Sequence, residues 1–408
     1  MRHDARNEMA EEFMQPVPVL TDDAEALRVA ARLSARLAEG DAKRDANREL
    51  PHAEVAELAS SGLLGVTVPA RFGGADVSPR TMGELMASLS AGDASVGQIP
   101  QNHYFFVQVL TEAGSEEQQK FFAAEVLAGR HFGNALSERS SRTAQDFDIR
   151  FEPRASGDVL IDGVKYYATG SPFAPWIPIY AKNPEGRLVA AWVPADHPGV
   201  TVLDDWVGMG QRTTGSGSVR FDNVTIPARW VVPAWRIFAG PEVFGAYGNY
   251  LHAGIDLGIA DRALADAKQL IHTLARPRAE SAAPSVATDP VVIQTFGELA
   301  LRVRAARALL HEAGDAIAAA RKELTEASAA EASIAVAAAR AAADTAAVSV
   351  ASDMFALVGT RSAAEGLNLH RHWRNARTHT LHDPRRLKIQ YLGDHALNDV
   401  PPPPTGLV

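Results

Sequence analysis

Three residues near the C-terminal end have side chains that could transfer protons. His379, His382 and Asp383 lie within residues 378–384 (THTLHDP), and an imidazole can donate or accept a proton near neutral pH. Because His379 and His382 are three positions apart, we expect them to share one face of a helix. Two histidines alone make a poor metal site, and Asp383 is only a possible third ligand, so we predict no bound metal.

A further candidate is His103, which directly precedes Tyr104 and two phenylalanines. An imidazole beside such apolar side chains either carries protons in a pocket or is a core histidine whose two nitrogens are hydrogen-bonded to their surroundings. The sequence leaves both interpretations of His103 open.

The composition excludes several classes of protein. The chain has 408 residues, a net charge of −9 and no cysteine, which excludes disulfides, thiolate catalysis, iron–sulfur clusters and zinc ribbons. We find no basic stripe for nucleic acid, no run of about 18 apolar residues for a membrane span, and no signal peptide in the polar residues 1–20. Glycine motifs for nucleotides, such as G-x-G-x-x-G and the P-loop, do not occur. We therefore expect a cytoplasmic protein without nucleic-acid or membrane partners.

The candidate residues must be positioned by three regions that follow one another. Residues 21–130 have helical periodicity, residues 131–240 have the pattern of short strands and turns, and residues 241–398 are helical again, with polar tails at 1–20 and 399–408. We predict an α+β fold with an N-terminal all-α domain, a small middle β-barrel or β-sandwich, and a C-terminal four-helix bundle. A ligand would bind where the β-domain meets the bundle.

Local signals predict where individual elements begin and turn. Asp22 with Asp23, Ser78 and Ser115 have the side chains and positions of helix N-caps. The dipeptide Asp162-Gly163 predicts a hairpin between two strands. Residues 183–186 (NPEG) predict a second turn between strands.

Three segments resemble the flavin-binding region of the acyl-CoA dehydrogenase superfamily. They are residues 132–138 (FGNALSE), residues 165–171 (KYYATGS), and residues 208–214 (GMGQRTT) with the strand pair that continues to residue 227. The resemblance extends over nearly the whole folded chain and includes residues 374–377 (RNAR), where the superfamily usually has Arg-Asp-Ala. It implies that the flavin is bound by Leu136, Ser137, Thr169, Gly170 and Ser171.

The physical demands of a flavin agree with this resemblance. The polar edge of the ring needs backbone donors and small hydroxyls, which residues 136–137 and 169–171 can supply, and its faces need flat apolar cover, which Tyr167, Phe173 and Trp176 can supply. Each segment by itself is also typical of an ordinary strand and turn. The signal lies in their order and spacing.

One departure from the dehydrogenase pattern bears on the reaction. In those enzymes a glutamate a few residues beyond Arg-Asp-Ala commonly removes the substrate α-proton, whereas this chain has His382, Asp383 and Pro384 at about that place. Aspartate is one methylene shorter, and a misplacement of about 1 Å can cost on the order of 100-fold in rate. The sequence therefore favours a reaction other than dehydrogenation.

Residues 378–384 instead resemble the reduced-flavin monooxygenases of this fold, such as dibenzothiophene monooxygenase. The chain is still more similar to the SfnB-type sulfur acquisition oxidoreductase family. The strings that carry this likeness are residues 99–103 (IPQNH), 133–139 (GNALSER), 204–206 (DDW), 210–214 (GQRTT) and 372–377 (HWRNAR).

This resemblance implies a monooxygenase that receives reduced FMN, or alternatively FAD, from a separate NAD(P)H-dependent flavin reductase. Dioxygen, as co-substrate, would form a flavin hydroperoxide that oxygenates a small sulfone, sulfonate or sulfide in sulfur acquisition. His382 and His103 would hold the reacting oxygen, Asn134 and Ser171 would donate hydrogen bonds beside the flavin, and His379 would orient its neighbours.

The resemblance also implies roles for six further residues. Arg276 and Arg278, from a neighbouring subunit, and Arg377 are expected on the cofactor, and Tyr104, Phe173 and Trp206 are expected in the substrate pocket. Simpler roles remain open: Asn134 as a turn former, the two loop arginines as exposed side chains, and Trp206 as a filler of the β-domain.

Two other functions remain open at the level of sequence. One is an FAD-dependent acyl-CoA dehydrogenase, and the other is a non-catalytic scaffold that keeps the fold. In either case the resemblance implies a homotetramer assembled through the C-terminal bundle. The sequence leaves open the substrate, the choice between FMN and FAD, and the identity of the reductase.

Overall fold

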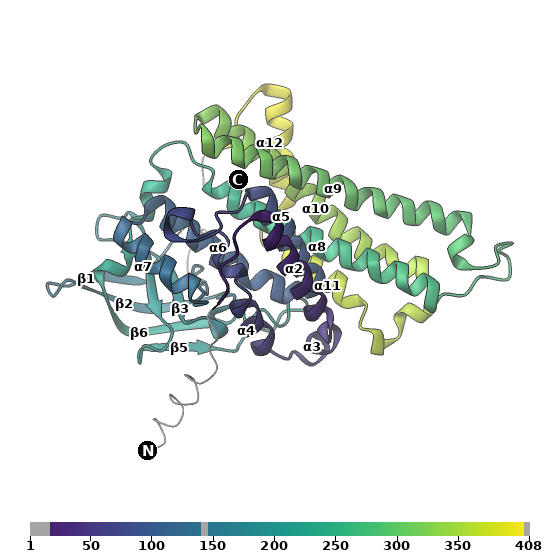
Figure 1. Cartoon of the computed structure of the whole chain (residues 1–408), viewed down its shortest axis with the longest axis horizontal. Coiled ribbons are helices and arrows are strands. Elements are labelled where there is room, and N and C mark those ends of the chain that lie inside the picture. Colours follow the sequence, from purple (N-terminus) through teal and green to yellow (C-terminus); the bar gives the residue numbers. More distant parts are fainter. Residues whose placement is uncertain (1–16, 140–145, 404–408) are drawn as a thin grey trace, which may run out of the picture.

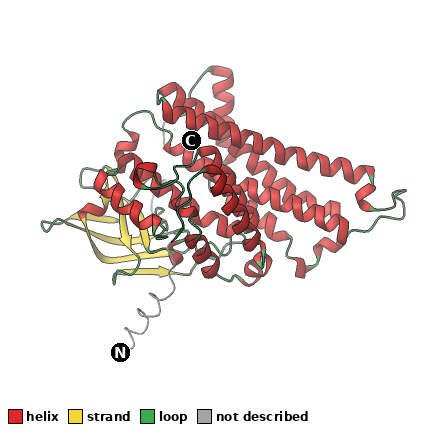
Figure 2. Ribbon diagram, viewed as in Figure 1, coloured by secondary structure: helices red, strands yellow, loops and turns green. Residues whose placement is uncertain are grey.

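The structure is a computed structural model that describes residues 17–139 and 146–403. Residues 1–16 of the expected N-terminal tail and residues 404–408 of the expected C-terminal tail lie outside the described residues. Along the chain, helices come first, strands follow, and longer helices complete the fold (Figures 1 and 2). This order confirms the predicted α+β class.

The N-terminal helices begin at the predicted capping residues. Asp22 accepts from the amide of Glu25, and Ser78 accepts from the amide of Thr81. Ser115 and Gln118 form a complete capping box. The helices of this region are α2 (Asp23–Ala38), α3 (Asp41–Asn47), α4 (His52–Ser60), α5 (Pro79–Gly92), α6 (Ala94–Ala113) and α7 (Glu116–Leu127).

The strands form two small antiparallel sheets. One has the order β1-β2-β6-β5 and the other the order β3-β4-β7. Side chains from both sheets form a shared apolar core, which includes Ile161, Ile179 and Phe221. The strands are β1 (Arg150–Pro153), β2 (Asp158–Lys165), β3 (Trp176–Lys182), β4 (Leu188–Pro194), β5 (Val200–Leu203), β6 (Ser218–Pro227) and β7 (Val231–Val232).

One predicted turn in this region is confirmed and one is wrong. Residues 183–186 do turn between β3 and β4, which pair from Trp176↔Pro194 to Lys182↔Leu188. Asp162 and Gly163, by contrast, lie inside the continuous strand β2, at a bulge where its register against β6 shifts. Gly163 has a φ of 148°, so the glycine relieves a bulge here. The dipeptide signal is local, whereas β6 supplies a partner along the whole strand.

The C-terminal helices are long and pack side by side. They are α8 (Phe244–Thr273), α9 (Pro290–Lys322), α10 (Glu326–Val358), α11 (His370–His379) and α12 (Arg385–Asn398). In Figure 1 they extend away from the strands. By length and composition α10 could cross a membrane, but 67% of its most apolar window is buried inside the fold, as in the core helix of a globular protein.

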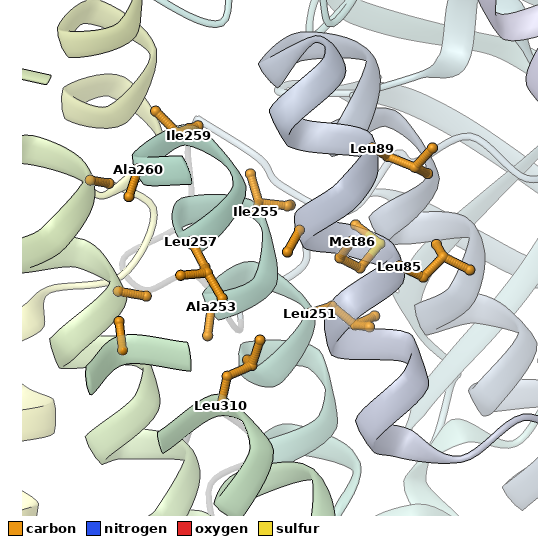
Figure 3. Packing of buried hydrophobic residues seen from close by; sticks show 14 of the residues in the cluster. Leu85, Met86, Leu89, Leu251, Ala253, Ile255, Leu257, Ile259, Ala260 and Leu310 are labelled. Carbon is orange, nitrogen blue, oxygen red and sulfur yellow. The ribbon is translucent and has the colours of Figure 1, made fainter. Parts of the chain in front are cut away.

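Glycines let α5 of the N-terminal region approach α8 of the bundle closely. A Cβ at Gly258 would overlap the carbonyl oxygen of Ala87, and a Cβ at Gly254 would lie 2.8 Å from the carbonyl oxygen of Gly83. Leu85, Met86 and Leu89 of α5 pack beside α8 in the same core (Figure 3). The N-terminal helices and the bundle therefore share one apolar core.

Candidate active site

The two segments expected to bind flavin lie against each other at one edge of the β-domain. The amide of Gly133 donates to the carbonyl of Trp176 (2.8 Å), and the amide of Tyr166 donates to the carbonyl of Ser137 (2.8 Å). The hydroxyl of Ser171 donates to the carbonyl of Asn134 (2.9 Å) and accepts from the Asn134 amide (3.2 Å). Asn134 and Ser171 are thus brought together, and Leu136 and Ser137 lie in the same segment.

The side chain of Asn134 leaves one polar atom for a ligand. Its Nδ2 donates to the carbonyl of Tyr167 (3.3 Å), while its buried Oδ1 has no hydrogen-bond partner among the described residues. A buried acceptor without a partner is costly, so such an atom indicates a donor that is supplied from outside the chain. The N–H groups on the polar edge of a flavin are donors of that kind.

A row of buried hydroxyls continues from the second segment. Thr169 Oγ1 lies 2.7 Å from Ser216 Oγ, which lies 2.6 Å from Thr214 Oγ1. Gly170, with a φ of 79°, donates its amide to the carbonyl of Thr214 (3.1 Å). Thr169 and Gly170 are therefore fixed by the loop 206–216. The chemistry of this donor and acceptor set fits the edge of a flavin.

The loop 206–216 also contacts the middle of α11. The amide of Gln211 donates to Asn375 Oδ1 (2.7 Å). A Cβ at Gly210 would overlap the carbonyl of Arg374, so only glycine permits this approach. The next residue on that face of α11 after Asn375 is His379, about 6 Å further along the helix.

Helix α8 likewise begins at the β-domain. The ring of Phe244 lies 4.5 Å from that of Phe105, which lies 6.2 Å from the ring of Tyr180 on β3. Phe244, Gly248 and His252 are spaced four residues apart and share one helix face. His252, two turns beyond Phe244 on α8, contacts His379, one turn beyond Asn375 on α11.

A buried cluster of ionisable side chains forms where α8, α10 and α11 meet. His379 Nδ1 lies 2.6 Å from Asp256 Oδ1, and His379 Nε2 lies 2.9 Å from His252 Nδ1. Arg340 of α10 forms an ion pair with Asp256. All four side chains are at least 95% buried.

His382 stands at the solvent side of this cluster. α11 ends at His379, so the expectation that His379 and His382 share a helix face is wrong: the Thr380 amide donates to the Ala376 carbonyl at the C-cap, and His382 follows in a turn. The His382 ring still reaches the cluster, with its centroid 4.2 Å from that of His252. His382 is exposed in the single chain, but the protein atoms beneath it, with Arg340 and His379, lower its pKa to about 4.

Asp383, which occupies about the place of the dehydrogenase glutamate, is held in an ion pair. Its carboxylate lies 2.6 Å from the ammonium of Lys388 on α12. The Lys388 ammonium therefore occupies this carboxylate. The neighbouring His382, whose ring lies over that of His252, offers an imidazole at this place.

His103 lies apart from the histidine cluster and is completely buried on α6. Its Nδ1 accepts from the amide of Phe132 (3.2 Å), so its Nε2 carries the proton and donates to the carbonyl of Leu64 (2.9 Å). Burial lowers the pKa of His103 to about 3. Because both nitrogens have backbone partners, this geometry favours an anchoring role at the start of the flavin-binding segment over the predicted catalytic one.

The residues expected in the substrate pocket lie in three different places. Tyr104 is in the apolar core, and its hydroxyl donates to the carbonyl of Leu63 (3.0 Å). Phe173 packs against His52 at 5.0 Å, beside Ser171. Trp206 donates to the carbonyl of Gln211 (2.7 Å) and lies 6.2 Å from Tyr167.

The three arginines expected to bind the cofactor lie in two different parts of the chain. Arg377 on α11 donates to Thr380 Oγ1 (2.7 Å), and its buried Nε has no partner among the described residues. Arg276 and Arg278 are exposed in the segment between α8 and α9, at the end of the bundle away from the strands (Figure 1). Within one chain they are far from the flavin-binding segments, as the expectation of a neighbouring subunit requires.

Sequence reasoning missed His252, Asp256 and Arg340. Two of them could have been found, because His252 and Asp256 are four residues apart in a stretch of α8 that is otherwise almost entirely apolar and buried. A polar pair at one-turn spacing in such a helix must find partners. Nothing local marks Arg340 as their partner on α10.

Comparison with known proteins agrees with this architecture. Residues 21–130 match the family model "Acyl-CoA dehydrogenase, N-terminal domain", and residues 250–384 match "Acyl-CoA dehydrogenase, C-terminal domain". The chain is 30% identical to the probable FMNH2-dependent monooxygenase SfnC of Pseudomonas putida, over 95% of this chain and 98% of that protein.

Two solved structures have the same fold over nearly their whole length. FMN-bound TdsC, a dibenzothiophene monooxygenase from Paenibacillus sp. A11-2, is 30% identical with a TM-score of 0.88, covering 94% of this chain and 100% of that one. The methanesulfinate monooxygenase MsuC from Pseudomonas fluorescens is 28% identical with a TM-score of 0.85, covering 94% and 99%. The chain belongs to the acyl-CoA dehydrogenase superfamily and, within it, to the SfnB-type flavin-dependent monooxygenase branch.

Proposed function

We propose that this chain is a reduced-flavin-dependent monooxygenase that oxygenates a small organosulfur compound, of the sulfone, sulfonate or sulfide class, in sulfur acquisition. One observation carries the proposal. At the place expected for the catalytic glutamate of a dehydrogenase, Asp383 is in an ion pair with Lys388, and the imidazole of His382 lies over that of His252. The names of TdsC, MsuC and SfnC support the same class of reaction.

Reduced FMN fits the residues at the edge of the β-domain. The unpartnered Oδ1 of Asn134, the hydroxyl of Ser171 and the backbone of residues 136–137 would hold its polar edge, and Arg377, with Arg276 and Arg278 of a neighbouring subunit, would hold its phosphate. When bound, reduced FMN supplies the two electrons that activate dioxygen, so that one oxygen atom reaches the substrate and the other leaves as water.

The chain's own residues then have to keep a proton in place and keep water out. His382, whose pKa is about 4, is neutral at pH 7, so it can accept a hydrogen bond or a proton at the reacting oxygen. Electrons come from a separate NAD(P)H-dependent flavin reductase, since the chain has no nicotinamide motif. We also propose that the protein is a homotetramer and is located in the cytoplasm.

The test mixes anaerobic protein and reduced FMN with oxygen, using methanesulfinate and dibenzothiophene as probe substrates. We expect oxygenated sulfur product in the wild type, and in His382→Ala a product yield lowered about 10²-fold with a matching rise in peroxide. His197→Ala, at a half-buried histidine of the β-domain outside the histidine cluster, serves as control and should behave as wild type.

The outcome against the proposal is equally concrete. A dehydrogenase would bind oxidised FAD tightly and bleach it when an acyl-CoA is added without oxygen. Bleaching by an acyl-CoA, together with no sulfur product from reduced FMN, would replace the proposed reaction with thioester oxidation. Binding of neither flavin would leave only a scaffold.

A further inference from the structure

The side chains of Asp256, His379 and His252 form a continuous hydrogen-bonded line across the bundle. The line runs from Asp256 Oδ1 to His379 Nδ1 (2.6 Å), and from His379 Nε2 to His252 Nδ1 (2.9 Å). All three residues are at least 95% buried. The line ends at His252 Nε2, which has no partner among the described residues.

The ionised carboxylate fixes the direction of the protons in this line. Burial alone would raise the pKa of Asp256, but His379 and Arg340 lower it below its ordinary value, so Asp256 stays charged. A carboxylate only accepts, so His379 Nδ1 donates to it. In neutral His379, Nε2 is then an acceptor, and His252 Nδ1 must donate to it. His252 Nε2 is consequently left as a lone pair.

The open end of the line belongs to the imidazole ring that His382 covers. The ring of His252 is stacked under that of His382, with centroids 4.2 Å apart and planes at 33°. His252 also lies on the face of α8 that begins at the β-domain with Phe244. The Nε2 lone pair lies in the plane of the His252 ring, so a proton reaches it from the edge of the ring and not through the face that His382 covers.

We propose that Asp256, His379 and His252 act as a proton relay for the oxygenation reaction, with His252 Nε2 as its entry point. This inference rests on the proposed function. A proton bound at His252 Nε2 is matched by transfer of the Nδ1 proton of His252 to His379 Nε2. The positive charge then resides on His379, against the carboxylate of Asp256. No electron moves, and the reverse transfers restore the starting state.

The neighbouring charged groups favour a positive charge on the His379 ring over a positive charge on the His252 ring. Burial, His382, His379 and Arg340 all lower the pKa of His252 well below its ordinary value, whereas His379 is in contact with Asp256. Arg340 opposes the stored charge only in part, because it is itself bound to Asp256. The other charged groups that face the cluster are Asp344 on α10, Arg377 on α11, and Asp383, Arg385 and Lys388 at α12.

The decisive variants are Asp256→Asn and His252→Gln. Asp256→Asn removes the charge that holds His379, but it leaves Arg340 unpaired and can unfold the bundle. His252→Gln removes only the entry point and leaves the pair of Asp256 and Arg340 intact. The matched control is His372→Gln, because His372 forms a similar buried pair with Asp266 (2.8 Å) that is bonded to none of these side chains.

The first measurement needs neither flavin nor turnover. Histidine labelled with ¹⁵N in the purified chain reports which ring nitrogen carries the proton. We expect His252 in the wild type to be protonated at Nδ1 only, and this preference to be lost in Asp256→Asn. A wild-type His252 protonated at Nε2 would overturn the relay, whatever reaction the protein catalyses.

The second measurement is the pH profile of product yield per reduced FMN with methanesulfinate and with dibenzothiophene. We expect a 10²-fold to 10³-fold lower oxygenation rate in His252→Gln, roughly the range for a lost proton carrier, with FMN affinity within about twofold of wild type. In Asp256→Asn the acid limb should move to lower pH, because the relay loses its stabilising anion. An unchanged rate and profile, or equal losses in His372→Gln, would overturn the relay. A wild type that yields no sulfur product would instead refute the proposed function.

Discussion

The ring of His103 binds together three segments that are distant in the sequence. Its Nδ1 accepts a hydrogen bond from the amide of Phe132, and its Nε2 donates one to the carbonyl of Leu64. The ring is therefore fixed as one neutral tautomer. The folded-state pKa of about 3 lies below the ordinary 6.5. Between these two values the unfolded chain binds more protons than the folded chain, so stability is lost as the pH falls.

We therefore predict that His103 makes the fold acid-sensitive. Between about pH 6 and pH 4 its contribution to the free energy of unfolding should decline by roughly 1.4 kcal/mol per pH unit. Urea titrations at several pH values measure this slope, and His103→Gln should be less stable at pH 7 and have a shallower slope. Equal slopes in both proteins would contradict the assignment. His131, whose pKa burial lowers to about 4, adds a slope of the same sign.

A second residue-scale prediction concerns the buried pair of Lys165 and Glu138. The Lys165 ammonium also donates to the carbonyls of Leu136 (3.1 Å) and Tyr180 (2.7 Å), directly behind the flavin-binding segment. Lys165→Met leaves the buried Glu138 carboxylate its bonds from the amides of Asp148 and Ile149 but removes its positive counter-charge, at a cost of about 3–5 kcal/mol. Thermal unfolding measures the loss, and Lys165→Met with Glu138→Gln should recover part of it. If the double variant is no more stable than the single one, the pair is not the cause.

At the scale of the elements, the contact between α5 and α8 depends on glycine. A Cβ at Gly258 would overlap the backbone of Ala87, whereas a Cβ at Gly297 on exposed α9 would have nothing within 4 Å. We predict that Gly258→Ala destabilises the fold by about 1–3 kcal/mol, while Gly297→Ala stabilises it by up to about 1 kcal/mol through helix propensity. Denaturant midpoints compare the two. Equal effects would mean that the helices can move apart freely.

The elements also show which parts of the molecule were predictable from sequence. Helix starts at Asp22, Ser78 and Ser115 were predicted correctly because capping is local. The hairpin at Asp162-Gly163 was wrong because the partner strand β6 decides whether a turn forms. The flavin-binding segments were recognised by their strings, whereas His252 and Arg340 were missed because their meeting depends on how α8 and α10 pack.

For the whole molecule, α9 presents apolar side chains that the chain itself leaves uncovered. Val291, Ile293 and Leu301 are 72%, 56% and 66% exposed, which is typical of a surface that a second copy covers. We predict that Leu301→Glu lowers the mass in analytical ultracentrifugation, while Val19→Glu in the N-terminal region does not. Affinity for FMN should fall in parallel, if Arg276 and Arg278 reach a neighbouring site. An unchanged mass would place the interface elsewhere.

The loop 206–216 is held against α11 at some positions and exposed to solvent at others. Gly210 and Gln211 are tied to α11, but Val207 and Met209 are 89% and 48% exposed. We propose that Trp206 lines the substrate pocket, and we therefore expect substitutions at Val207 and Met209 to change the substrate preference without disturbing the histidines. A small combinatorial library at Val207 and Met209 is the natural starting point for redirecting such an enzyme to other sulfur compounds.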